Sequence, residues 1–180
     1  MNRLLHAAHF AAEKHTAQRR KNTAGTPYIN HPLEVAHHLA TVGEVEDEDI
    51  LIAAVLHDTI EDTATTRDEI AATFGERVAA LVMECTDDKS LEKPERKRLQ
   101  IVNAPNKSAG AKQIKLADKT CNLRSILVDP PAGWSRERQH DYFRWAGQVI
   151  AGLLGANPPL DAAALAALSD GLARFAAQPD

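Results

Sequence analysis

The sequence predicts an all-α fold, built as a compact domain of many helices. Aromatic residues make up only 4% of the chain, whereas alanine is abundant, and this balance favours tightly packed helices over a sheet. No segment shows the sustained polar–apolar alternation and β-branched enrichment of a strand. Instead, successive segments begin and end with residues that start or stop helices.

The first elements in chain order are three helices. Leu4–Gln18 is predicted as the first, and the turn-rich stretch QRRKNTAGTPYINHP follows it. The second is expected over Pro32–Val42, because a proline in the first turn lacks only an N–H group that would be unpaired there anyway. The acidic stretch EVEDEDI complements the dipole at the start of a third helix, which is expected to run through Ile50 to His57.

The remaining helices are marked by caps and by loops that contain glycine or proline. The stretch TTRDEIAATFG has a threonine cap, acidic residues in its first turn and a terminal Gly75, so both ends of a helix are defined. The loops KSLEKPE, NAPNKSAG, DPPAGW and GANPPL separate the later helices. These later helices are expected over Glu76–Thr86, Pro94–Asn103, Ala109–Val128, Ser135–Leu154 and Asp161–Ala177.

The size and charge of the chain argue against several classes of protein. Its 180 residues predict one domain, spanning 1–180, with a sizeable core. The net charge of -4 argues against general binding to nucleic acid. No uncharged apolar run reaches the roughly 18 residues that span a bilayer, and the N-terminus lacks the apolar centre of a signal peptide. Cys85 and Cys121 lack metal-binding spacing and suit free thiols in a reducing compartment, so a cytoplasmic location is expected.

The stretch AAVLHDTIEDT, residues 53–63, joins an apolar helix end to a group of ionisable side chains. His57 and Asp58 are adjacent, and Glu61 and Asp62 follow one turn later. Carboxylates this close repel one another, and buried charges are costly unless they are paired or bound to a metal. A bound cation would remove both costs.

Two further residues could complete a metal site. His31 lies in YINHP, just before the proline-started helix, where its side chain can point into a pocket. Asp118 lies in the otherwise apolar stretch IKLADKTCNL and needs a partner if it faces the core. Together with His57 and Asp58 they form a mixed nitrogen and oxygen ligand set that suits Mn, Fe, Zn and similar divalent ions. Spacing alone leaves a metal site and a salt-bridged core as alternatives.

The H…HD…D pattern of these residues resembles that of the HD-domain phosphohydrolases, an all-helical superfamily. More specifically, several segments resemble the alarmone hydrolase domain of the RelA/SpoT family: QRRKNTAGTPYINHPLEVA, AAVLHDTIEDT, TFGERVAALVMECTDDK, KPERKRLQ and GAKQIKLADKTCNLRSI. The likeness is strongest over residues 9–154 and is closest to single-domain members, the metazoan SpoT homologue and the bacterial small alarmone hydrolases. An HD-domain architecture is therefore expected.

This resemblance implies hydrolysis of guanosine 3′,5′-bis(diphosphate) and its pentaphosphate form, (p)ppGpp, to pyrophosphate and GDP or GTP. It also implies Mn²⁺ as the cofactor and a small nucleotide as the partner, with no nucleic acid and no membrane, and it leaves a homodimer open. The chain ends at Asp180, without room for the synthetase domain that follows in bifunctional relatives. A stand-alone hydrolase is therefore expected.

Roles for individual side chains follow from the same resemblance. The metal ligands would be His31, His57, Asp58 and Asp118. The catalytic pair would be Glu61 and Asp62, which orient and deprotonate the attacking water. Read without the family, this pair is also compatible with an acidic cap on the loop before TTRDE.

The nucleotide would be held by cations and polar groups from three segments. Arg20 and Lys21 would face its base and ribose, although the run RRK could by itself be a solvated face. Asn122 shares a helix face with the aspartate four residues before it, and could donate to a ribose or phosphate oxygen. Arg138 and Tyr142, also four residues apart, resemble family positions near a diphosphate.

Two other functions fit parts of the pattern. The same pocket could remove a phosphate from another ribose-phosphate cofactor, such as the 2′-phosphate of NADPH. A metal-free binding module with the same helical shell would have lost ligands or catalytic carboxylates, but all six positions are filled. Cys121 stands where close relatives tend to carry an aromatic residue, so one wall of the nucleoside pocket is expected to be looser.

Overall fold

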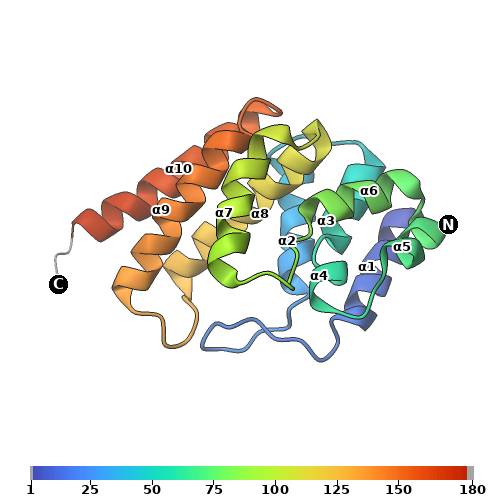
Figure 1. Ribbon diagram of the computed structural model, residues 1–180, viewed down its shortest axis with the longest axis horizontal. Coiled ribbons are helices and arrows are strands. Elements are labelled where there is room, and N and C mark those ends of the chain that lie inside the picture. The colour runs from blue at the N-terminus through green and yellow to red at the C-terminus, as the bar shows by residue number, and fades with distance from the viewer. Residues whose placement is uncertain (1, 178–180) are drawn as a thin grey trace.

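The computed structural model describes residues 2–177, and these residues form an all-α architecture (Figure 1), which confirms the predicted fold class. The helices are α1 (Arg3–Lys14), α2 (Asn30–Thr41), α3 (Glu48–Leu56), α4 (Thr59–Asp62), α5 (Arg67–Phe74), α6 (Glu76–Cys85), α7 (Lys93–Asn103), the 3₁₀ helix η1 (Ala104–Asn106), α8 (Ala109–Val128), α9 (Arg136–Leu153) and α10 (Pro158–Ala176). None of the helices in these residues is long and apolar enough to cross a membrane.

Helix α8 forms the centre of the core. It packs against α2, α3, α6, α9 and α10, and it runs through the middle of the molecule (Figure 1). Ile114, Leu116 and Leu123 on this helix are fully buried. Each side chain of this size contributes roughly 1.5–3 kcal/mol when it leaves water. A polar residue on α8 is thus held by a helix that the core fixes from several sides.

Local signals set several helix ends as expected. The Thr66 side chain accepts a hydrogen bond from the backbone N–H of Glu69 at the start of α5. Gly75 ends this helix with a φ of 101°, a backbone conformation that favours glycine. The Ser135 side chain caps α9 by accepting from the backbone N–H of Arg138. These caps satisfy N–H groups that have no partner inside their helices.

Three features of the N-terminal half differ from the sequence prediction. Helix α1 ends at Lys14 instead of Gln18, because the chain turns at His15 and Arg19 then forms an isolated β-bridge with Pro27. Helix α2 begins two residues earlier than predicted, with Pro32 inside its first turn. The short helix α4 was not expected; it follows a break of two residues after α3.

Two loops meet along one edge of the molecule. The loop from α1 to α2 and the loop from α8 to α9 lie along the lower edge in Figure 1. The backbone N–H of Ala132 donates to the carbonyl oxygen of Lys21 at 2.7 Å, and Asn22 donates to the Asp129 carboxylate at 2.8 Å. This contact brings the basic stretch before α2 next to the C-terminal end of α8.

Gly171 of α10 packs directly on the ring of Phe143 from α9. A Cβ atom at position 171 would lie 1.9 Å from Cε1 and 2.4 Å from Cδ1 of this fully buried ring. We expect Gly171→Ala to lower the free energy of unfolding by about 1–3 kcal/mol, since the packed ring has no room to move away. Denaturant unfolding measures this effect. The exposed Ser169→Ala on the same helix is the control, and an unchanged midpoint for Gly171→Ala would contradict the packing.

Candidate active site

His57 and Asp58 occupy the break between α3 and α4. The hydroxyl of Thr59 donates to the carbonyl oxygen of Leu56 at 2.7 Å and so closes the end of α3. The His57 ring is fully buried, and its Nδ1 donates to the carbonyl oxygen of Ala54 at 2.7 Å. With Nδ1 protonated, Nε2 of a neutral ring carries the lone pair, and this is the tautomer that a metal ligand needs.

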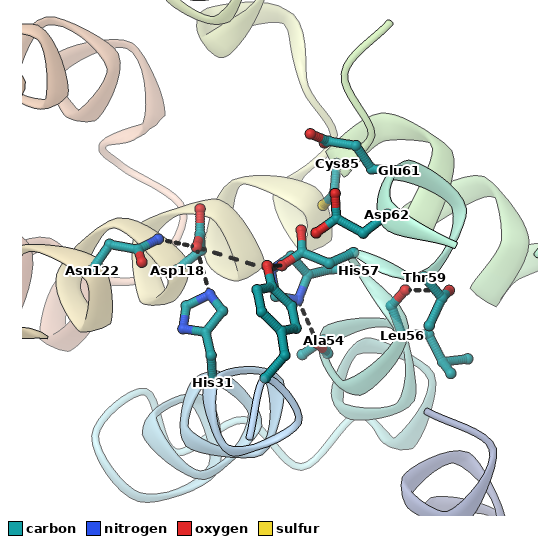
Figure 2. A network of polar contacts seen from close by, with 12 residues as sticks. His31, Ala54, Leu56, His57, Thr59, Glu61, Asp62, Cys85, Asp118 and Asn122 are labelled. Atoms are coloured by element: carbon teal, nitrogen blue, oxygen red, sulfur yellow. Dashed lines mark hydrogen bonds and ion pairs between the residues drawn. The ribbon is translucent and has the colours of Figure 1, made fainter. Parts of the chain in front are cut away.

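His31 and Asp118 meet His57 from two other helices. Nε2 of His31, in the first turn of α2, lies 3.1 Å from Oδ1 of Asp118 on α8, and Nε2 of His57 lies 3.9 Å from the same oxygen. The three side chains are buried, and they place one ligand atom each within 4.8 Å of one another. Figure 2 shows His31 pointing up from its helix toward Asp118, and Asn122 one turn further along α8.

The charges around Asp118 fit a bound divalent ion. Oδ2 of Asp118 lies 3.2 Å from Nζ of Lys119 and 3.6 Å from Nζ of Lys115, both buried, while Oδ1 faces the two imidazoles. Burial by itself raises the pKa of Asp118, but the two ammonium groups and the histidines hold it well below its usual range. A charged carboxylate and neutral imidazoles are the forms that bind metal.

The surroundings of Nε2 of His57 also test whether this site suits a divalent metal ion. This buried atom has no hydrogen-bond partner among the described residues, although it lies 3.1 Å from Oδ2 of Asp58. Burial alone lowers the pKa of His57, but the carboxylates of Asp58 and Asp118 outweigh it and raise the pKa to about 9. The carboxylates therefore attract a positive charge to this point, and a divalent ion provides it more fully than a proton does. The residues present fit a divalent metal.

Asp58, the predicted fourth ligand, lies beside the cluster formed by His31, His57 and Asp118. Its Oδ2 accepts a hydrogen bond of 2.5 Å from the hydroxyl of Tyr28. Burial and the Asp58 carboxylate both raise the pKa of Tyr28, so the phenol keeps its proton and remains a donor. Tyr28 thus fixes the direction of the Asp58 carboxylate.

Glu61 and Asp62 lie on α4, one turn after the cluster (Figure 2). Oε2 of Glu61 accepts from the backbone N–H of Asp87 at 3.1 Å, and burial raises the pKa of Glu61 above its ordinary value. Asp62 forms an ion pair with Lys89 and accepts from the Gln18 side chain at 2.9 Å. The two carboxylates therefore have different surroundings: burial favours proton uptake by Glu61, while a cation and an amide hold Asp62.

A cleft of two lobes opens beside these carboxylates. The two cavities measure about 430 and 490 Å³. Five residues line both lobes: Lys21, Glu61, Arg96, Trp134 and Tyr142. Tyr28 and Asn122 line the first lobe and also bond to Asp58 and Asp118, so the metal-fitting cluster lies directly behind that wall.

The first lobe is lined by four of the five residues predicted to bind the nucleotide: Arg20, Lys21, Asn122 and Tyr142. The guanidinium group of Arg20 donates to Oδ1 of Asn122 at 3.1 Å, and Nδ2 of Asn122 donates to Oδ1 of Asp118 at 2.6 Å. Asp118 and Asn122 thus share one face of α8, as their spacing predicts. Lys21 is exposed on the lining of both lobes.

The second lobe is lined by Arg138, the fifth predicted residue, and shares Lys21 and Tyr142 with the first lobe. The Arg138 guanidinium stacks over the ring of Trp134, 4.5 Å from its centroid, and the Tyr142 ring lies between Trp134 and Trp145. Lys97 lies 4.6 Å from the centroid of Trp145 and adds a further cation. This lobe therefore offers positive charge and aromatic faces, a combination suited to an anionic nucleotide.

A family model described as an HD domain matches residues 7–158 of the chain. The chain belongs to the HD domain family. The predicted resemblance is thereby confirmed.

Several proteins of known function are similar to this HD domain. Guanosine-3′,5′-bis(diphosphate) 3′-pyrophosphohydrolase MESH1 of Homo sapiens is 55% identical over 160 residues, which cover 89% of each chain. The protein of the same name from Drosophila melanogaster is 48% identical over 88% of this chain and 89% of its own length. A solved structure described as a metazoan ortholog of SpoT that hydrolyses ppGpp matches with a TM-score of 0.92 at 45% identity, over 96% of this chain and 97% of that one.

The structure of this HD domain adds site residues that sequence reasoning missed. Tyr28 and Gln18 contact Asp58 and Asp62 from the loop before α2, and Lys89 contacts Asp62 from the loop before α7. A hydroxyl-bearing ring three residues before His31 was a signal for Tyr28. Gln18 and Lys89 carried no such signal, because neither lies within a few positions of a predicted metal ligand or catalytic residue in the sequence.

The sequence predicted that Cys121 would loosen one wall of the nucleoside pocket, but the structure does not place Cys121 on such a wall. Its side chain is 1% exposed and belongs to the hydrophobic core of the HD domain. The described residues that line the two lobes do not include it. A thiol at this position therefore changes the packing behind the site rather than a wall of the cleft.

Proposed function

We propose that this single domain is a divalent-metal-dependent hydrolase of ppGpp and pppGpp, which it cleaves at the 3′-pyrophosphate. The observation that carries the proposal is the buried cluster of His31, His57 and Asp118 directly behind a cation-lined cleft with two carboxylates at its edge. The identity of 55% to a human protein named as a ppGpp 3′-pyrophosphohydrolase supports the same substrate.

The reaction breaks the bond between phosphorus and the 3′-oxygen of ribose. The oxygen of a water molecule bonds to that phosphorus, pyrophosphate leaves with it, and the ribose oxygen takes up a proton, which gives GDP from ppGpp. We propose that His31, His57, Asp58 and Asp118 hold Mn²⁺, which when bound stabilises the negative charge that develops on the phosphate oxygens.

Two carboxylates of the chain would act on the attacking water, one by accepting its proton and one by orienting it. Glu61 is the general base, because its raised pKa suits it to accept a proton from the attacking water. Asp62, paired with Lys89, orients that water. Arg20, Lys21 and Asn122 face the nucleoside, while Arg138 and Tyr142 face the second diphosphate, where cations offset its charge.

Product analysis tests this proposal. The purified protein is incubated with ppGpp and Mn²⁺ and, separately, with NADPH, and the products are chromatographed. We expect pyrophosphate and GDP, with loss of turnover after chelation or in Asp58→Ala, and full turnover in Asp68→Asn, whose side chain is 94% exposed on α5. Parallel assays with Mg²⁺ and Zn²⁺ test the preference for Mn²⁺. Turnover of NADPH alone would assign another substrate, and no turnover of either would contradict the proposal.

A further inference from the structure

The Asp62 carboxylate is held at both of its oxygens. The Gln18 side chain donates from Nε2 to Oδ2 at 2.9 Å, and Lys89 forms an ion pair with Oδ1. The two partners come from the loop before α2 and the loop before α7, on opposite sides of α4 in the sequence. Asp62 is the last residue of a four-residue helix, so the helix alone does little to fix its side chain.

The orientation of the Gln18 amide is in turn set by His15. Nδ1 of His15 lies 2.6 Å from Oε1 of Gln18. For Nε2 of Gln18 to donate to Asp62, Oε1 must accept, so Nδ1 of His15 carries the proton. Nε2 of His15 is buried without a hydrogen-bond partner among the described residues, so Gln18 is the polar group that the ring contacts.

His15 also contacts Tyr28, the residue that donates a hydrogen bond to Asp58. The His15 ring packs against Tyr28 with 5.0 Å between centroids, and Tyr28 donates to Asp58. His15 is 2% exposed and lies outside the lining of both lobes, so it is placed to act only through its neighbours. One buried ring therefore contacts the supports of two different carboxylates.

The loop between α6 and α7 holds both proposed catalytic carboxylates. The backbone N–H of Asp87 donates to Glu61 at 3.1 Å, and Lys89, two residues later, pairs with Asp62. The Gln100 side chain of α7 donates to the Asp87 carboxylate and ties this loop to a longer helix. The relative position of Glu61 and Asp62 is thus fixed by residues outside their own helix.

We propose that Gln18 and Lys89 are positioning residues that clamp the Asp62 carboxylate, and that His15 sets the Gln18 amide for this task. The clamp rests on the proposed function, in which Asp62 orients the attacking water. A carboxylate with both oxygens held keeps its remaining lone pairs in fixed directions toward that water, whereas a released carboxylate rotates and pairs with solvent. Misplacement of about 1 Å in such a group can cost on the order of a hundredfold in rate.

The kinetic test compares Gln18→Leu, His15→Leu and His15→Asn with the wild type at saturating Mn²⁺. We expect Gln18→Leu and His15→Leu to lower kcat by about 10–100-fold, with KM for ppGpp changed less than about threefold, as for other supports of active-site groups. The Asn side chain places an N–H near the position of Nδ1, so His15→Asn is expected to recover kcat to within a few fold of the wild type. Thermal unfolding and bound-metal content are measured for each variant.

Two substitutions of Lys89 test its role in the clamp. Lys89→Met is expected to lower kcat without a matching rise in KM, and Lys89→Arg, which keeps the ion pair, to recover most of it. If KM rises about tenfold in Lys89→Met while kcat holds, Lys89 binds substrate phosphate and the clamp is wrong. Likewise, an unchanged kcat in a folded, metal-loaded Gln18→Leu overturns it. The wild-type protein tests the proposed function, because inactivity of the wild type toward ppGpp would contradict that function. The variants test only the clamp on Asp62.

Discussion

Asp118→Asn is expected to abolish both metal binding and ppGpp hydrolysis. The substitution keeps the shape of the side chain but removes the charge that faces the two imidazoles at 3.1 and 3.9 Å. A neutral amide is a poor ligand beside histidines, so Mn²⁺ should no longer be retained after dialysis. Loss of the ion should reduce kcat/KM by roughly a thousandfold or more, because a bound ion contributes several kcal/mol of charge stabilisation in the transition state.

The same substitution also leaves two buried cations without their counter-charge. Lys119 and Lys115 lie 3.2 and 3.6 Å from Asp118, and breaking a buried pair can cost about 3–5 kcal/mol of stability. The double variant Asp118→Asn/Lys119→Met separates the two effects. We expect it to recover part of the unfolding temperature while metal content and turnover stay lost. Full metal occupancy with wild-type turnover in either variant would contradict the assignment of Asp118 as a ligand.

Helix positions were largely predictable, because most of them are determined by local chemistry. Ser, Thr and Gly caps such as Thr66 and Gly75 act within a few residues, and the 20-residue helix Ala109–Val128 was predicted with its observed bounds. Helix α4 was missed, since four residues are too few to show a helical period. The overlong first helix has a different cause: the chain leaves the helix at His15 to make long-range contacts that no local propensity encodes.

The site was predictable where a charged residue interrupts an apolar pattern, and not where a partner comes from elsewhere in the chain. Three predicted ligands follow or interrupt apolar runs: His57, Asp58 and Asp118. A buried ionisable side chain needs a partner or a metal ion, so these positions indicated a site. By contrast, Gln18 contacts a carboxylate 44 positions away, and Lys89 one 27 positions away. Both are ordinary polar residues of loops, and only the fold brings them to α4.

Glu61→Gln is expected to remove most of the catalysis while leaving the metal in place. The amide keeps the hydrogen bond from the backbone N–H of Asp87, but it cannot accept a proton from water. Loss of a positioned general base costs about 10²–10⁴-fold in kcat, and we expect a loss within this range with little change in KM. Steady-state kinetics measure it, and metal analysis of the same samples should give wild-type occupancy.

The pH profile tells whether Glu61 is the base or only a support. Burial and the nearby Asp58 carboxylate raise the pKa of Glu61 above its ordinary 4.5. A base works only when deprotonated, so wild-type kcat/KM should fall as the pH drops through this raised pKa, at a higher pH than an exposed glutamate would give. At constant metal occupancy, the residual activity of Glu61→Gln should lack this decrease. The same acid decrease in the variant would assign the base to another group, and Asp62 would be the next candidate, since it is the other carboxylate of α4 at the edge of the cleft.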